Sequence, residues 1–162
     1  MLSVNKLDLK KSNFIRNICI GLVDGVTIPL ALAAGLSGIV MDSSPVIIAC
    51  LIASFTGAIT MTIGGYIEGK KYGNKENPVL SAFTIGAGYF SGGFITSIPY
   101  FFAEYPMIAL RYAAIIAMAA LFIAGYWESR LNGSKGWSNA LRVCIIAGIA
   151  AVAAFLVAKL FR

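Results

Sequence analysis

Five long runs of apolar residues divide the chain, and short polar connections separate them. The runs cover residues 14–40, 45–66, 79–102, 106–126 and 137–160. A helix needs about 20 predominantly apolar residues to cross a membrane, and each run reaches that length. The pattern predicts an all-α polytopic membrane protein in which residues 1–162 form a single bundle of five transmembrane helices.

One carboxylate interrupts the apolar pattern of the first run. Asp24 is the only acidic residue well inside any of the runs. At a helical rise of about 1.5 Å per residue it lies roughly 15 Å from the start of its run, near the centre of a bilayer. A charge at that depth costs roughly 3 kcal/mol even on lenient insertion scales, so it should face protein or water. We interpret Asp24 as a functional residue; the structural alternative is a hydrogen bond to a neighbouring helix.

Other polar residues of the first run fall on the helix face that carries Asp24. At 100° per residue, Asn13, Asn17 and Thr27 share that face, which predicts the lining of a pathway from one end of the helix to its middle. Pro29 lacks the N–H that would bind the Gly25 carbonyl. The freed oxygen must face protein, water or a ligand, so a kink and an available carbonyl are expected beside Asp24.

The second run contains a methionine between two glycines of the same helix face. Met61 lies four residues after Gly57 and three before Gly64, so another helix can approach its thioether closely. If that helix is the first one, Asp24, the Gly25 carbonyl and Met61 meet near mid-membrane. A carboxylate with a thioether suits a first-row transition metal better than Mg²⁺ or Ca²⁺. The alternative for Met61 is ordinary core packing.

Composition excludes several classes of function. The chain is 59% hydrophobic and only 12% charged, with a mean hydropathy of +0.82, which is too apolar for a soluble domain. It has no histidine, and no Walker loop, Rossmann fingerprint, zinc-ligand cluster or Ser/His/Asp set. We therefore predict that it is not an enzyme and that no cofactor is tightly bound.

The basic residues indicate topology rather than a nucleic-acid surface. The net charge is +6, but the bases gather at the amino-terminal head and in the second and fourth connections, while the first and third carry none. By the positive-inside rule, the amino terminus is cytoplasmic and the carboxyl terminus is outside. No cleavable signal peptide is evident, and we expect the cell (plasma) membrane as the location.

Two motifs resemble a known family. The sequence DGVTIPLALAAG at 24–35 and the sequence GAITMTIGGY at 57–66 are similar to the vacuolar iron transporter family, and the likeness extends over nearly the whole chain. The resemblance implies five transmembrane helices and a homodimer with the translocation path between the first two helices of each protomer. It also implies export of Fe²⁺ or Mn²⁺ from the cytosol in exchange for protons, with metal ligands at Asp24 and Met61.

The chain departs from the family pattern in three places. The family usually has a Glu where this chain has Ala53, and often an acidic residue where it has Asn17. The family's iron transporters carry a long helical metal-collecting unit between the second and third spans, whereas here the connection is only residues 67–78. The chain resembles a minimal member. Glu68 and Glu76 of this connection, with Glu128, are candidates for gathering cations at the entrance, or are solvated charges.

Charge balance favours a dimer. One Asp24 cannot neutralise a divalent ion, but two across a symmetry axis, with two Met61 and freed carbonyls, supply the charge and most of an octahedral shell. A cation that binds the carboxylates would expel their protons, which couples the two. Two alternatives stay open: the same fold transports another cation or small solute, or the protein is a membrane scaffold or sensor with Asp24 protonated and hydrogen-bonded.

Overall fold

The computed structural model describes residues 6–71, 77–131 and 136–161, which contain helices and turns but no strand. The helices are α1 (Lys6–Ser37), α2 (Ser44–Lys71), α3 (Pro78–Phe102), α4 (Pro106–Leu131) and α5 (Gly136–Leu160). All five are long and apolar enough to cross a membrane. The predicted all-α bundle of five transmembrane helices is confirmed.

Three helices are longer at one end than the apolar runs predicted. Helix α1 begins at Lys6 rather than at residue 14, α2 continues to Lys71 rather than 66, and α4 continues to Leu131 rather than 126. An apolar run ends where the membrane ends, but the helix does not have to. Lys, Arg and Glu are good helix formers, so these segments continue as helix through the polar residues at their ends.

Prolines mark where α2, α3 and α4 begin. Pro78 and Pro106 are the first residues of α3 and α4, and Pro45 is the second residue of α2. A proline is well suited to the first turn because the N–H it lacks would have no partner there, and its φ angle is already helical.

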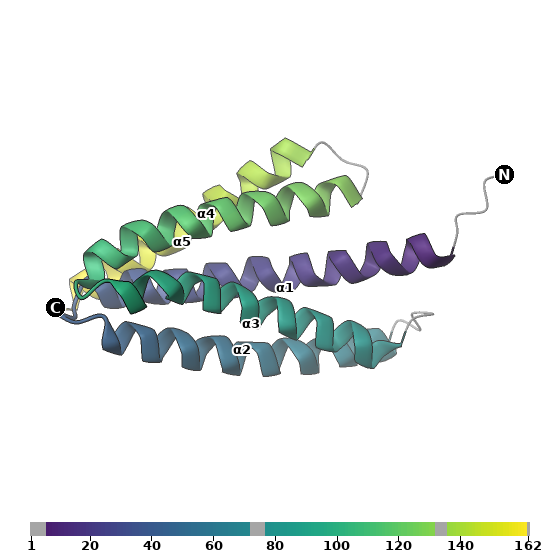
Figure 1. Ribbon diagram of the computed structural model, residues 1–162, viewed down its shortest axis with the longest axis horizontal. Helices are drawn as coiled ribbons and strands as arrows, with labels where there is room; N and C mark the ends of the chain where they lie inside the picture. The colour runs from purple at the N-terminus through teal and green to yellow at the C-terminus, as the bar shows by residue number, and fades with distance from the viewer. Residues whose placement is uncertain (1–5, 72–76, 132–135, 162) are drawn as a thin grey trace.

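Helix α1 lies at the centre of the bundle. It packs against each of the other four helices. Figure 1 shows it running between α4 and α5 on one side and α2 and α3 on the other. The start of α1 and the end of α5 lie at opposite ends of the molecule, as an odd number of spans requires (Figure 1).

Helices α1 and α3 approach each other through two glycine motifs. A Cβ added at Gly21 or Gly25 would overlap the backbone of Ile85 or Tyr89, and one added at Gly88 or Gly92 would overlap the backbone of α1. The motifs Gly21-x-x-x-Gly25 and Gly88-x-x-x-Gly92 therefore pack against each other. Small residues permit this backbone contact between membrane helices, although the sequence did not say which motifs would pair.

Hydrogen bonds tie the helices together at the end where α1 finishes. The Ser43 hydroxyl lies 2.5 Å from the Ala103 carbonyl and 3.1 Å from the Glu104 carbonyl, and the Ser43 N–H donates to Glu104 as well, at 3.2 Å. The hydroxyls of Ser37 and Tyr100 are 3.0 Å apart. These bonds fix the turn between α1 and α2 against the turn between α3 and α4. We call this the outer end, following the predicted topology.

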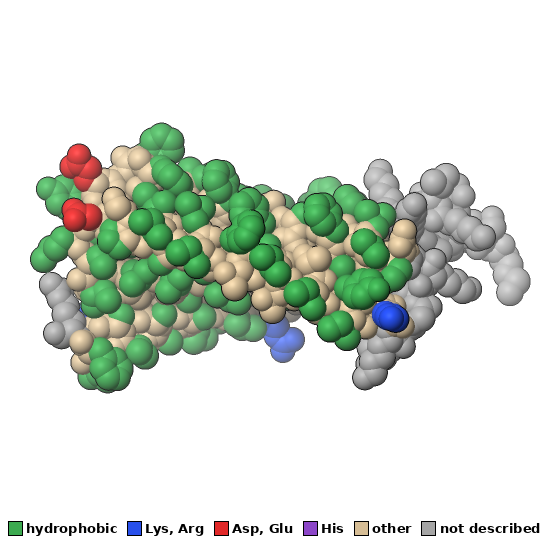
Figure 2. All heavy atoms as spheres, turned by 90° about the horizontal axis from the view of Figure 1, so that it is seen from below, with side chains coloured by type: hydrophobic (Ala, Val, Ile, Leu, Met, Phe, Trp, Pro, Cys, Tyr) green, Lys and Arg blue, Asp and Glu red, His purple; other side chains and the backbone are tan. Residues whose placement is uncertain are grey.

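Small apolar side chains fill the core, and large ones point outward. One cluster, at the outer end, joins α1, α2, α3 and α4; its buried members are Ala33, Val46, Cys50, Tyr100, Ala109 and Ala113. A second cluster, further along, joins α1, α4 and α5; its buried members are Val26, Leu30, Ala117, Leu121 and Ala147. Hydrophobic side chains cover most of the length of the face seen in Figure 2, and the acidic side chains in view lie at one end. A surface of this kind is typical of contact with lipid.

Candidate metal-transport site

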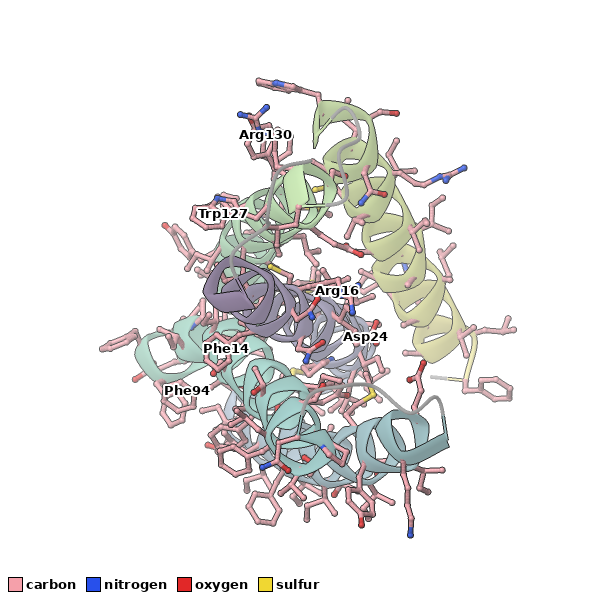
Figure 3. All side chains as sticks on the ribbon, turned by 90° about the vertical axis from the view of Figure 1, so that its right-hand side faces the viewer. Phe14, Arg16, Asp24, Phe94, Trp127 and Arg130 are labelled. Carbon is pink, nitrogen blue, oxygen red and sulfur yellow. The ribbon has the colours of Figure 1, made fainter. Side chains whose placement is uncertain are left out.

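Asp24 lies on a face of α1 that the other described helices leave partly open. Its side chain is half-buried, and one turn away on either side Ile20 is 37% exposed and Ile28 is 52% exposed. In Figure 3, Asp24 and Arg16 lie on the same side of α1, whereas Phe14 and Phe94 lie on the opposite side. Packing against α2, α3, α4 and α5 occupies the other faces of α1, and this face is partly open along the middle of the helix.

The Asp24 carboxylate has no hydrogen-bond donor or basic partner within the described part of the chain. Arg16 lies two turns before it, about 12 Å along the helix axis. The Nε of Arg16 is itself buried and has no hydrogen-bond partner among the described residues. A carboxylate in the middle of an apolar helix is expensive to leave without a partner. The arrangement is therefore suited to binding a cation or a proton from outside the chain.

The predicted polar stripe is divided between two roles. Asn17 is buried, and its Nδ2 donates to the Ser81 Oγ of α3 at 2.5 Å. Thr27 donates to the Val23 carbonyl of its own helix at 2.8 Å. Asn13 is half-buried and has a partner. The Asn17 amide thus joins α1 to α3 on the path toward Asp24. An ionised acidic side chain at this position would have no hydrogen to donate, so it could not make the same bond.

Pro29 and Gly25 are both buried against neighbouring helices. The Cys50 S–H of α2 donates to the Pro29 carbonyl at 3.6 Å. The Gly25 backbone packs against Tyr89 of α3. Pro29 has no N–H, so the Gly25 carbonyl lacks its usual helical donor. The carbonyl oxygen that the sequence predicted to be free is therefore that of Gly25, a residue in the contact between α1 and α3.

Met61 is half-buried on α2, and its two flanking glycines have different surroundings. A Cβ at Gly57 would overlap the far end of the Tyr89 ring, whereas a Cβ at Gly64 would meet nothing within 4 Å. Thus the Tyr89 side chain of α3 reaches α2 one turn from Met61. Helices α1 and α2 are in contact, but near Asp24 and Met61 the third helix takes part as well.

Tyr89 is a residue that sequence reasoning missed. It is only 3% exposed, its backbone packs on Gly25, and its ring packs on Gly57. Its hydroxyl lies at the ring end that packs against Gly57 of α2. The available signal was a tyrosine in the middle of an apolar run among glycines, because most other tyrosines lie at the ends of spans.

The remaining predicted acidic residues do not approach Asp24. Glu68 is exposed near the end of α2, Glu128 is half-buried near the end of α4, and Glu76 lies outside the described residues. No group of three or more His, Cys, Asp or Glu capable of holding a metal occurs in residues 6–71, 77–131 and 136–161. One protomer therefore contributes few charged ligands at mid-membrane.

Comparison with known proteins gives consistent matches. A family model described as the VIT family matches residues 15–73 and 69–159. Vacuolar iron transporter 1 of Arabidopsis thaliana is 30% identical, covering 91% of this chain and 86% of the relative. Vacuolar iron transporter 1 of Eucalyptus grandis is 29% identical, covering 90% and 85%. Protein CCC1 of Saccharomyces cerevisiae is 26% identical, covering 90% and 68%.

The matches also locate a difference in length. The alignment with the Arabidopsis relative runs over 215 positions, more than the 162 residues of this chain, so the relative contains residues with no counterpart here. The two stretches of the family match meet at residues 69–73, where α2 ends. Relatives that are named transporters agree with the prediction that the chain is not an enzyme.

Proposed function

Because this chain belongs to the VIT family, we propose that it is a membrane transporter that moves a divalent transition metal, Fe²⁺ or Mn²⁺, out of the cytosol. The observation that carries this proposal is Asp24, a carboxylate at mid-span on the open face of α1 with no partner in the described chain. Intramembrane carboxylates that face an open side mark ion pathways. The names of the relatives, vacuolar iron transporters, supply the class of cargo.

Asp24 and Met61 are the proposed metal ligands, and the Gly25 carbonyl oxygen is the proposed third donor. A carboxylate and a carbonyl offer hard oxygen, and the thioether of Met61 offers a softer atom. This mixture disfavours Mg²⁺ and Ca²⁺, which prefer oxygen alone. Met61 is half-buried, and a Cβ at Gly64, three residues later, would meet nothing within 4 Å.

The proposal includes a homodimer in which the open faces of two α1 helices meet. Ile20 and Ile28 are exposed beside Asp24, and Gly64 of α2 has open space around it. A two-fold axis along this surface would bring two Asp24 carboxylates together and balance the charge of a divalent ion. It would also remove both carboxylates from lipid, which a single protomer does not do.

Proton antiport follows from the chemistry of the same carboxylates. An isolated carboxylate at this depth is neutralised either by a proton or by a bound cation, and the two exclude each other. Release of the metal on one side therefore requires uptake of protons there. Asp24 is the only carboxylate in the middle of a described span, so it is the proposed coupling group.

Loading of the metal differs from that of the longer relatives in this proposal. The connection after α2 is short, and Ala53 and Asn17 replace acidic positions of the family pattern. Glu68, exposed at the end of α2, is the nearest described carboxylate to this connection. We expect weaker collection of metal from dilute solution, with the amino terminus cytoplasmic and the protein in the cell membrane. The vacuole named for the relatives is the other location to test.

Transport into liposomes tests the proposal directly. Purified protein is reconstituted around an internal fluorescent chelator, and uptake of Fe²⁺, Mn²⁺, Co²⁺, Zn²⁺ and Ca²⁺ is compared with and without a pH gradient. We expect uptake of Fe²⁺ or Mn²⁺ that Asp24→Asn and Met61→Ala abolish and that Asp42→Asn, at an exposed loop position, leaves unchanged. No uptake of any of these ions by folded protein would refute metal transport, and uptake that ignores the pH gradient would refute the antiport.

A further inference from the structure

Tyr89 connects the two helices that carry the proposed ligands. Its backbone packs against Gly25, next to Asp24, and the far end of its ring packs against Gly57, one turn from Met61. The side chain thus extends from the contact between α1 and α3 across to α2. Only 3% of the residue is exposed. The hydroxyl is the outermost atom of that ring, so it lies beside α2 at the depth of the proposed site.

The Tyr89 hydroxyl makes no hydrogen bond within the described part of the chain. Tyrosine hydroxyls in a protein interior normally find a partner. The Tyr89 hydroxyl is not among the fully buried polar atoms, so a ligand from outside the described chain can reach it. Tyr100 of the same helix follows the rule, since its hydroxyl pairs with the Ser37 hydroxyl at 3.0 Å. Tyr89 and Tyr100 are eleven residues apart, and therefore on almost the same face of α3. Only the one near Asp24 has an unused hydroxyl.

We propose that Tyr89 is a selectivity-determining residue of the transport path, whose hydroxyl oxygen contacts the cation held by Asp24. This inference rests on the proposed function. The Tyr89 backbone packs on Gly25, next to Asp24, and the ring end reaches Gly57, one turn from Met61, so the side chain extends between the two proposed ligands. The geometry gives the hydroxyl a partner that is present only when the cargo is bound.

The chemistry of the group indicates which ions it favours. A neutral phenol oxygen is a hard donor without charge, and it adds an oxygen to a site that also contains a thioether. Oxygen donors suit Mn²⁺, whereas sulfur suits softer ions. Ala53, one turn before Gly57, offers no oxygen to the site. Tyr89 therefore shifts the balance of the site toward Mn²⁺ and away from softer ions of the same charge.

The test is Tyr89→Phe, which keeps the ring and removes one oxygen. Initial rates of uptake of Mn²⁺ and Co²⁺ are measured in liposomes over a range of concentrations. We expect the KM for Mn²⁺ to rise about tenfold, as for loss of one contact to a charged group. We expect the KM for Co²⁺ to rise less than about threefold, and the maximal rates to change little. Tyr100→Phe is the matched control: it should lower the melting temperature and leave both KM values unchanged.

A second variant moves the same atom without altering Tyr89. Gly57→Ala places a methyl group against the ring end and hydroxyl, so it should change the ratio of the two KM values in the same direction. Equal ratios for wild type, Tyr89→Phe and Gly57→Ala would overturn the inference. If the wild type moves Fe²⁺ but neither Mn²⁺ nor Co²⁺, the inference is overturned while the proposed function stands. If it moves none of the three ions, the proposed function itself fails, and this is seen before any variant is compared.

Discussion

The two sides of α1 differ in almost every physical respect. The side toward α3 consists of glycines whose hydrogens touch the backbone of the neighbouring helix, as at Gly21 and Gly25. A neighbouring face carries Asp24 between two exposed isoleucines. The first surface has no room for even a methyl group, and the second is only partly covered by the described helices. Stability is concentrated on one side of the helix, which leaves the other available for a charged group.

This division has a physical reason. Membrane helices cannot gain stability by moving apolar side chains out of water, so they depend on close packing and hydrogen bonds. Contact between backbones provides both for α1 and α3, together with the Asn17 to Ser81 hydrogen bond. A carboxylate contributes nothing to such packing and costs free energy in lipid. The stability of the monomer therefore does not explain Asp24 on the open side.

The largest effect is expected from filling the glycine contact. Gly21→Val would force its side chain into the Ile85 backbone, which belongs to a helix and cannot rotate away. We expect a loss of about 3 kcal/mol or more, enough to prevent folding in the membrane. Measurement of the monodisperse fraction and the melting temperature in detergent checks this. Gly64→Val, at a glycine with nothing within 4 Å, should leave both quantities close to wild type.

The next effect concerns the open side and separates activity from stability. Asp24→Asn removes the charge and keeps the shape, so metal uptake should fall to background. The melting temperature should stay the same or rise, because an unpaired carboxylate is costly at this depth. Uptake and thermal unfolding are measured on the same preparation. A fall in stability of more than about 1 kcal/mol would show that Asp24 has a structural partner, in favour of the scaffold alternative.

A third, smaller effect is expected at the outer end. Ser43→Ala removes the hydroxyl that lies near the Ala103 and Glu104 carbonyls. The loss should be about 1–2 kcal/mol, because these acceptors keep other partners or reach water. The KM for metal should not change, since the site is several turns away. Ser44→Ala, at an exposed position, serves as the control, and a changed KM for Ser43→Ala would contradict a purely structural role.

Much of this arrangement was predictable from the sequence, and the exceptions have a common cause. Apolar runs gave the number of spans because membrane thickness limits their length. The cost of a buried charge singled out Asp24. The apolar pattern did not predict that α2 continues to Lys71 and α4 to Leu131, because polar residues that favour helix continue these helices beyond the apolar runs. The partner of each glycine motif was not predictable, because nearly every helix here contains small residues and a single chain does not reveal pairing.

Tyr89 illustrates the same limit more sharply. The patterns around Asp24 and Met61 suggested that α1 and α2 meet directly, since both carry ligand types on faces with small residues. Which helix contributes to the space between them depends on tertiary packing. The sequence shows that a tyrosine is present but not where its side chain points. Its ring reaches Gly57 only because of the way α3 packs in the bundle.

The smallest expected effect compares the two glycines that flank Met61. Gly57→Ala should cost about 1–3 kcal/mol by crowding the Tyr89 ring, whereas Gly64→Ala should change the stability of the monomer by less than about 0.5 kcal/mol. The proposed homodimer would bring a second protomer near this side of α2. Larger side chains at Gly64 should then weaken dimerisation, which single-molecule photobleaching in liposomes measures. If Gly64→Trp leaves the dimer fraction unchanged while Gly57→Ala still destabilises the monomer, the partner does not contact α2 at Gly64, and the dimer must form through the exposed face of α1 alone.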